Sequence, residues 1–310
     1  MFSIQRNANQ EAMNTQLWTQ LYTPEDNTAT ATDNAAWSAR QTPFLRSQRV
    51  ELIGKLRADV FQVHGNLLLL DNVGLRVKLT VASQKFFLWS KTKDPDVEFI
   101  IQDCELLLKF YQVAPELSLA IEKMLLSHPA VFRYKSTELK TFVHPSVSQI
   151  ISVPVAVSGR LPTSLFITFC KTTDFSGTYD FNPYSFDHHS LEELSIFVNG
   201  VEKRYTMDFK APHQCSSILR ALYQDCGLTD EDSGSNFYTI PRLKNGNFAV
   251  SLDLTVDSSG YGESRNLDVH GCVRIQGRLK TVLPNSIMVL VLAEYDSVFE
   301  INSAREVTVY

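Results

Sequence analysis

The chain has 310 residues, of which 44% are hydrophobic and 11% aromatic, and its formal net charge is −5. This is enough apolar material for one large or two ordinary domains, and the aromatic content favours β structure. The mild acidity argues against nucleic-acid binding over the whole surface, and no uncharged apolar run approaches the roughly 18 residues of a membrane span.

The first 129 residues are expected to contain a poorly ordered segment, several strands and one helix. Residues 1–45 include a polar, repetitive stretch with little to bury, so this segment is predicted to be poorly ordered. Residues 75–79 alternate apolar and basic side chains with the period of a strand. Pro115 suits the first turn of a helix that the apolar spacing extends to residue 125 and that Pro129 ends. Strands are predicted at 50–53, at 67–70 and 75–79 on either side of a turn signal at 71–74, and at 97–110.

Basic residues gather loosely in this first part of the chain. Lys85, Lys91 and Lys93 lie near aromatic side chains and would suit a polar edge facing packaged nucleic acid. The simpler interpretation is a solvated loop, because Asp94 and Asp96 follow at once and dilute the charge. No specific nucleic-acid binding is therefore expected.

Residues 130–310 read as a series of short strands with a second helix. Asn199-Gly200 is the strongest hairpin signal in the chain. A helix fits residues 215–226, with Gly227 placed to end it. Many short strands with two small helices predict an all-β sandwich. The predicted strands are 138–143, 147–153, 164–170, 193–199, 201–205, 248–254, 273–276, 287–293 and 298–301.

No group of residues makes a convincing catalytic or metal site. His188 and His189, with the glutamates at 192–193, have metal-ligand composition, but adjacent side chains on a strand point to opposite faces. Residues 143–148 hold a histidine and two serines without the GxSxG elbow of a hydrolase. Phosphate-binding glycine loops are absent from the sequence. We expect no enzyme, no metal and no cofactor.

The five cysteines form no CxxC pair and match no zinc signature. We therefore expect free thiols in a reducing compartment. The first residues lack the apolar stretch of a secretory signal, so an intracellular, non-secreted protein is expected, in nucleus or cytoplasm.

Residues 174–189 form an aromatic, turn-rich connector between two apolar runs. Gly177 and Asn182-Pro183 set the turns. The rings either pack against a neighbouring subunit, where aromatic residues are favoured, or fill the core of their own domain. The candidate interface residues are Phe175, Tyr179, Asn182, Pro183, Tyr184, Phe186 and His188.

Four blocks, in this order along the chain, resemble the double jelly-roll major capsid proteins of Maverick/Polinton-type virus-like transposons and related animal DNA viruses. The blocks are residues 67–79, residues 175–188 followed by the hairpin at 198–200, residues 252–257, and residues 293–307. The resemblance extends from about Arg46 to Tyr310.

This resemblance implies a fold and a division of the chain. The fold would be a double jelly roll, with residues 46–129 as the back half of the first sandwich plus a linker helix, and 130–310 as the second. A long stretch normally precedes this part in the family, so the chain is expected to be N-terminally truncated and its first sandwich incomplete.

The resemblance also implies a function. The chain would be a subunit of a trimeric, hexon-like capsomer in an icosahedral virion capsid. Its partners would be identical chains, neighbouring capsomers and a penton-like minor capsid protein. Three alternatives stay open: a β-sandwich module that binds carbohydrate or a receptor, a penton-like minor capsid protein, and a cupin-like metal enzyme.

Overall fold

The computed structural model describes residues 41–61, 63, 69–90, 92, 95–209, 215–227, 238–262 and 266–310. Most of the segment predicted to be poorly ordered, residues 1–45, lies outside this part, because only residues 41–45 of it are described. The strands are β1 Ala130–His144, β2 Ile150–Arg160, β3 Ser164–Lys171, β4 Leu191–Val198, β5 Val201–Thr206, β6 Val250–Asp253, β7 His270–Leu279, β8 Ile287–Ile301 and β9 Val307–Val309. The helices are η1 Thr42–Ser47, η2 Asp59–Phe61, α3 Gln84–Phe87, α4 Pro115–Leu125, α5 Thr172–Ser176, α6 Ser216–Asp225 and α7 Ile240–Lys244.

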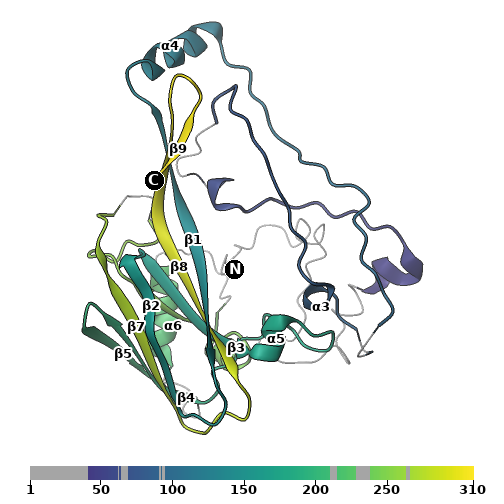
Figure 1. The fold of residues 1–310 in the computed structure, drawn as a ribbon, viewed down its shortest axis with the longest axis vertical. Helices are drawn as coiled ribbons and strands as arrows, with labels where there is room; N and C mark the ends of the chain where they lie inside the picture. Colours follow the sequence, from purple (N-terminus) through teal and green to yellow (C-terminus); the bar gives the residue numbers. More distant parts are fainter. Residues whose placement is uncertain are drawn as a thin grey trace.

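Two antiparallel sheets form a sandwich with jelly-roll strand order (Figure 1). One sheet has the order β1-β8-β3-β6, with β9 added on β8, and the other has the order β2-β7-β4-β5. The first strand therefore pairs with the eighth, the second with the seventh, the third with the sixth and the fourth with the fifth. This pairing is that of a long hairpin rolled into two sheets, which is a jelly roll. The predicted all-β, jelly-roll fold class is confirmed.

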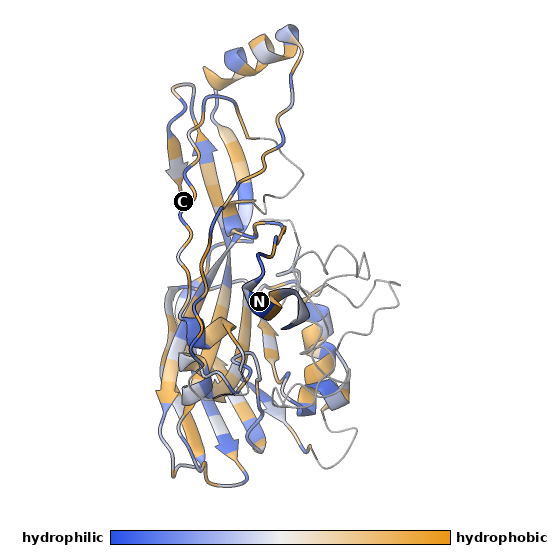
Figure 2. Cartoon of the chain, turned by 90° about the vertical axis from the view of Figure 1, so that its right-hand side faces the viewer, coloured by the Kyte–Doolittle hydropathy of each residue, from blue (hydrophilic) through white to orange (hydrophobic). Residues whose placement is uncertain are grey.

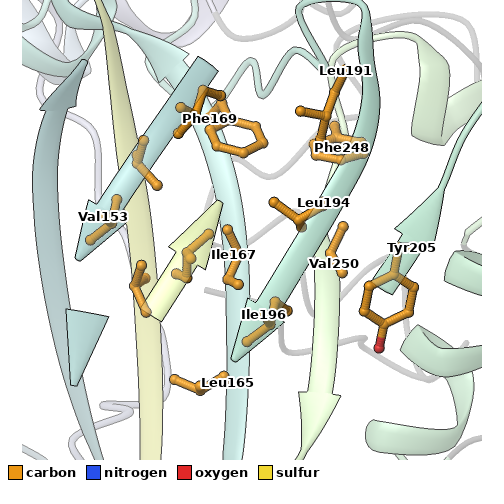
Figure 3. Packing of buried hydrophobic residues seen from close by; sticks show 14 of the residues in the cluster. Val153, Leu165, Ile167, Phe169, Leu191, Leu194, Ile196, Tyr205, Phe248 and Val250 are labelled. Atoms are coloured by element: carbon orange, nitrogen blue, oxygen red, sulfur yellow. The ribbon is translucent and has the colours of Figure 1, made fainter. Parts of the chain in front are cut away.

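The core between the sheets follows the period-two alternation of the strands (Figure 3). Leu165, Ile167 and Phe169 of β3 point inward and meet Leu194 and Ile196 of β4, all with essentially no exposed surface. The other face of the β1-β8-β3-β6 sheet is also covered, by smaller apolar clusters beneath the connector after β3 and beneath α6. Because this sheet is covered on both faces, its inner strands have nearly continuous apolar sequences.

Strands β1 and β8 are longer than predicted and extend beyond the sandwich as a ribbon (Figure 1). The prediction of two strands at 287–293 and 298–301 is wrong, because β8 pairs with β1 without interruption across residues 294–297. Those residues are more polar, and they are half-buried or buried. At the far end of the ribbon Phe132 stacks on Phe299 with ring centroids 4.8 Å apart.

The strands predicted at 50–53, 67–70, 75–79 and 97–110 are not found in the described part of these segments. Residues 50–53, 69–70, 73–79 and 97–110 belong to no helix or strand and have mostly exposed side chains, and residues 71–72 form a turn. Alternation indicates a strand only when a neighbouring strand closes the ladder, and no such pairing forms among the described residues. Helix α4 begins at Pro115 and ends at Leu125, as predicted. The domain division near residue 129 stays a prediction.

None of the helices that the structure describes has the length and apolar character of a membrane span.

Candidate assembly surface

The aromatic connector lies between β3 and β4 and begins with the single-turn helix α5. Its second half is fixed by backbone hydrogen bonds to the sandwich. The Phe186 N–H donates to the carbonyl of Gly246 at 2.8 Å, and the Phe248 N–H donates to the carbonyl of Phe186 at 2.9 Å. The Asp187 N–H donates to the carbonyl of Phe169 at 3.1 Å. The connector is therefore held as an ordered surface of the jelly roll.

Several of the candidate interface residues contact their own domain. Phe186 is buried in a cluster with Cys170, Met288 and Leu290, and Phe175 packs against this cluster. These two rings cover the outer face of the β1-β8-β3-β6 sheet.

Asn182, Pro183 and His188 have structural roles inside the connector. Asn182 and Pro183 are buried, and the Asn182 Oδ1 accepts a hydrogen bond from the Tyr184 N–H at 3.0 Å. His188 stacks on Phe209 with ring centroids 3.7 Å apart. Its Nδ1 accepts a hydrogen bond from the Ser190 N–H at 3.0 Å. These contacts shape the connector and leave little of the three side chains for a partner.

Two rings of the connector are open to solvent. Tyr184 is 46% exposed and Phe181 is 41% exposed. The Lys171 ammonium lies 5.6 Å from the centre of the Phe181 ring. Phe181 was not among the candidates, because an aromatic connector does not reveal from its sequence which rings face outward. The exposed pair is the part of this surface that a second protein can reach.

A distant segment, residues 83–90, lies against the connector. The Ser90 N–H donates to the carbonyl of Tyr179 at 2.9 Å, and Phe86 meets Tyr184 edge-on with centroids 5.5 Å apart. Gly177 has a φ of +87°, and a Cβ there would lie 2.8 Å from the Phe86 nitrogen. Only glycine fits this approach. Of the candidates, Tyr179 and Tyr184 thus form a junction between the sandwich and residues 83–90.

Gly177→Ala is expected to detach residues 83–90 while the jelly roll stays folded, because the added Cβ meets backbone at 2.8–2.9 Å. Limited trypsin digestion should cleave at Lys85 several-fold faster than in the wild type. Gly74→Ala is the matched control, since a Cβ there meets nothing within 4 Å. Equal cleavage of all three proteins would contradict the assigned contact.

The first and last of the four sequence blocks meet in the structure, at the C-terminal clasp of Arg305, Asp71 and Glu122. The Arg305 Nε donates to the carbonyl of Asp71 at 3.0 Å, and its terminal nitrogen bonds the Asp71 carboxylate at 3.2 Å. The same guanidinium also bonds the Glu122 carboxylate. Arg305 is only 13% exposed, so this contact fixes the turn at residue 71 and α4 to the β8–β9 hairpin.

A second contact, the Lys135 clasp, joins β1, β8 and two loops beside the sandwich. The Lys135 ammonium bonds the Asp296 carboxylate, and it donates to the Gly260 carbonyl at 2.7 Å and to the Thr163 hydroxyl at 3.4 Å. The ion pair is 15% and 9% exposed. Burial alone would raise the pKa of Asp296, but hydrogen bonds from Asn266 and Lys135 hold that pKa below its usual range.

The third sequence block supplies the loop that the Lys135 clasp holds. The Asp253 carboxylate accepts hydrogen bonds from the Thr255 N–H at 2.7 Å and from the Gly260 N–H at 2.8 Å. Asp253 thereby folds the loop and presents the Gly260 carbonyl to Lys135. Lys135 itself gave no signal in the sequence, because a lysine in an alternating strand usually faces solvent.

Two histidines of the connector, His188 and His189, are partly buried, and both have lowered pKa values. Burial lowers the pKa of His188 and of His189 below the ordinary 6.5. The carboxylates of Asp187 and Asp174 oppose this shift at His189, and Lys171 reinforces it. The His189 Nε2 makes no hydrogen bond among the described residues. Nothing in the described residues brings three His, Cys, Asp or Glu side chains together as a metal site requires.

Acid is expected to destabilise the connector. In the unfolded chain each histidine takes up a proton as the pH falls below about 6.5, whereas the folded state resists protonation because both pKa values are lowered. The free energy of unfolding should therefore fall with pH below that value. Thermal unfolding between pH 7.5 and 5.0 measures this, and His189→Gln should flatten the profile. His128→Gln, at an exposed position, is the control. Identical profiles for His189→Gln and the wild type would contradict the assignment.

No protein-family model matches the chain, and no curated protein matches it. The chain is similar to a cryo-EM structure of the Sputnik virophage, with 13% identity and a TM-score of 0.35 over 59% of this chain and 39% of that one. It is similar to PBCV-1 VP54 fitted into a reconstruction of Sputnik, with 10% identity and a TM-score of 0.41 over 64% and 54%. It is similar to the mavirus major capsid protein, with 8% identity and a TM-score of 0.34 over 59% and 42%. The chain thus spans less than two thirds of each of these three structures.

Proposed function

We propose that the chain is a structural subunit of an icosahedral capsid and acts without catalysis. The observation that carries the proposal is the joining of the sequence blocks typical of double jelly-roll capsid proteins. Arg305 of the last block holds Asp71 of the first, and Lys135 bonds both Asp296 of the last block and the loop of the third. The first, third and last blocks therefore share a physical role, which is to fix the ribbon, the loops and α4 relative to the jelly roll.

The proposed subunit works as a rigid wall with contact loops at its edges. The wall is the jelly roll, whose strands are held by the C-terminal clasp and the Lys135 clasp. Loops on such a scaffold tolerate sequence change, and they would make the contacts between copies. Three copies would form a hexon-like capsomer, and capsomers would meet one another and a penton-like protein in the virion. Kinship to Maverick/Polinton-type elements is part of this proposal and rests on the sequence blocks.

The exposed rings of Phe181 and Tyr184 are the proposed contact between copies on the connector. Aromatic side chains bury large areas with few rotatable bonds, which favours interfaces. Hydrogen bonds of Asn182 and Phe186 already fix the backbone that carries both rings. Association would therefore cost little conformational entropy of this backbone. A binding module would use the same two rings as a platform for a sugar, and it would act as a monomer.

The test compares self-association of the wild type with a Phe181→Ser/Tyr184→Ser double variant. Analytical ultracentrifugation over a concentration series should show the variant dissociating at tenfold or more higher concentration. Val201→Ser, at a residue 73% exposed on the β4–β5 hairpin, is the control and should associate like the wild type. A wild type that stays monomeric, or a double variant that associates as well as the wild type, would count against the proposal.

A further inference from the structure

Two extended segments of the N-terminal part, residues 75–81 and 100–106, present strand-like faces to solvent. Leu79 is 62% exposed, Val81 55% and Ile100 67%. Neither segment belongs to a strand, although both have the apolar and charged content of one. Figure 2 shows apolar colour along the extended chain that runs past the sandwich. Unpaired backbone and exposed apolar side chains of this kind invite pairing with another chain.

The chain on both sides of residues 75–81 is fixed to the jelly roll. Asp71 is held by Arg305, and residues 83–90 lie against the connector through Phe86 and Ser90. Residues 75–81 are therefore presented at a defined place, and neither segment joins a sheet of the sandwich (Figure 1).

The two segments are complementary in charge when they are aligned antiparallel with Val77 opposite Cys104. Arg76 then lies opposite Glu105, and Lys78 lies opposite Asp103. Opposite charges on directly facing strand residues stabilise the pairing. Asp103 already meets Arg49 at 2.7 Å, but both side chains are 68% exposed, and such pairs contribute little.

Most of the apolar residues fall on the other face in the same alignment. Leu75 faces Leu106 and Val81 faces Ile100, with Val77 and Cys104 between them. The four charged side chains thus share one face, together with Thr80 and Ile101, and the other apolar side chains share the opposite face with Gln102. A shift by one residue in either direction would break both charge pairs and place Val77 opposite Asp103 or Glu105.

We propose that residues 75–81 of one copy pair with residues 100–106 of a second copy as antiparallel strands in this register. The contact is reciprocal, since each copy offers both segments. The inference deepens the proposed function by naming one contact between subunits, and it rests on that function in requiring that copies associate.

The test uses Cys104, which is exposed, as a natural reporter. Directly opposite residues of an antiparallel pair lie within the Cα separation of a disulfide. All chains carry Cys272→Ser, which removes the other exposed thiol. Burial raises the pKa of Cys170 and of Cys226 to about 12, so these thiols stay unreactive near pH 8.

One chain carries the substitutions Val77→Cys and Cys104→Ser, so that residue 77 holds its only exposed thiol. A second, size-tagged chain has neither of these substitutions, so that Cys104 is its only exposed thiol. Neither chain can then form the disulfide within itself. Mixing the two under mild oxidation should give a mixed dimer on a non-reducing gel, at least fivefold above the level reached with Thr80→Cys in place of Val77→Cys. Equal crosslinking from both positions, or none, would overturn the proposed register.

The mass of the associated species separates this inference from the proposed function. If the wild type associates and the Val77→Cys chain does not crosslink, the pairing of these segments is wrong while the capsid role stands. If a chain with both Val77→Cys and Cys104 closes only an internal disulfide, the pairing lies within one copy, which also overturns the inference. A monomeric wild type that gives no mixed dimer would overturn both.

Discussion

Lys135→Ala is expected to lower the free energy of unfolding by about 3 kcal/mol or more, because it leaves the buried Asp296 carboxylate without its cation. The same change also removes the donor that holds the Gly260 carbonyl and the loop before β7. A loss of this size should lower the melting temperature by roughly 6–12 °C in a domain of this length. Urea unfolding followed by tryptophan fluorescence and circular dichroism measures it.

The matched control for this variant is Lys140→Ala on the same strand. Lys140 meets Glu138 at 3.4 Å, and that pair is 28% and 54% exposed. Exposed pairs of this kind contribute about 0–1 kcal/mol, so Lys140→Ala should unfold almost like the wild type. Equal losses in the two variants would show that the Lys135 clasp does not hold the ribbon and loops together.

Phe169→Ala is expected to cost about 3–5 kcal/mol of stability, which is the usual range for a buried phenylalanine. Phe169 has no exposed surface, and it stacks on Phe248 with centroids 5.7 Å apart. Its removal opens a cavity between the two sheets, where β3 meets the segment before β6. The urea midpoint of Phe169→Ala gives the loss if the variant folds.

Phe169→Leu keeps the variant measurable where Phe169→Ala fails to fold, and it should lie between Phe169→Ala and the wild type. Phe181→Ala is the control, because that ring is 41% exposed. If Phe169→Leu and Phe181→Ala both unfold at the midpoint of the wild type, the packing assigned to the sandwich core is wrong.

Local signals in the sequence predicted much of the second part of the fold. The Asn199-Gly200 hairpin is confirmed, with both residues at positive φ, as its tight turn requires. Pro115 begins α4, and α6 ends at Asp225, close to the predicted stop. These features depend on a few neighbouring residues, so the sequence contains the information directly.

Other features depend on partners that are remote in the sequence. Residues 294–297 looked like a break because they are more polar than their neighbours, yet Lys135 and Asn266 provide the partners that let β8 continue through them. The prediction of strands before residue 111 is wrong for the opposite reason. Their apolar and polar side chains alternate as in a strand, but their backbone pairs with no other strand among the described residues. Backbone pairing decides both cases, and a strand's own residues do not specify its neighbour.

The position of the aromatic connector was predictable from the sequence, and the exposure of its individual rings was not. The aromatic connector is where the sequence placed it, but Phe209 and Phe248 determine that His188 is covered, and both lie far along the chain. Phe86, which contacts Tyr184, comes from nearly a hundred residues earlier. Which rings stay open to a partner follows only from these long-range contacts.

The native mass of the purified chain tests the proposed capsid role most directly. Light scattering on the main chromatographic peak should give about 105.3 kDa, three copies of the 35.1 kDa chain, and images of that peak should show particles with threefold symmetry. A single species at 35.1 kDa across the accessible concentration range would contradict a self-assembling subunit and would favour a monomeric binding module.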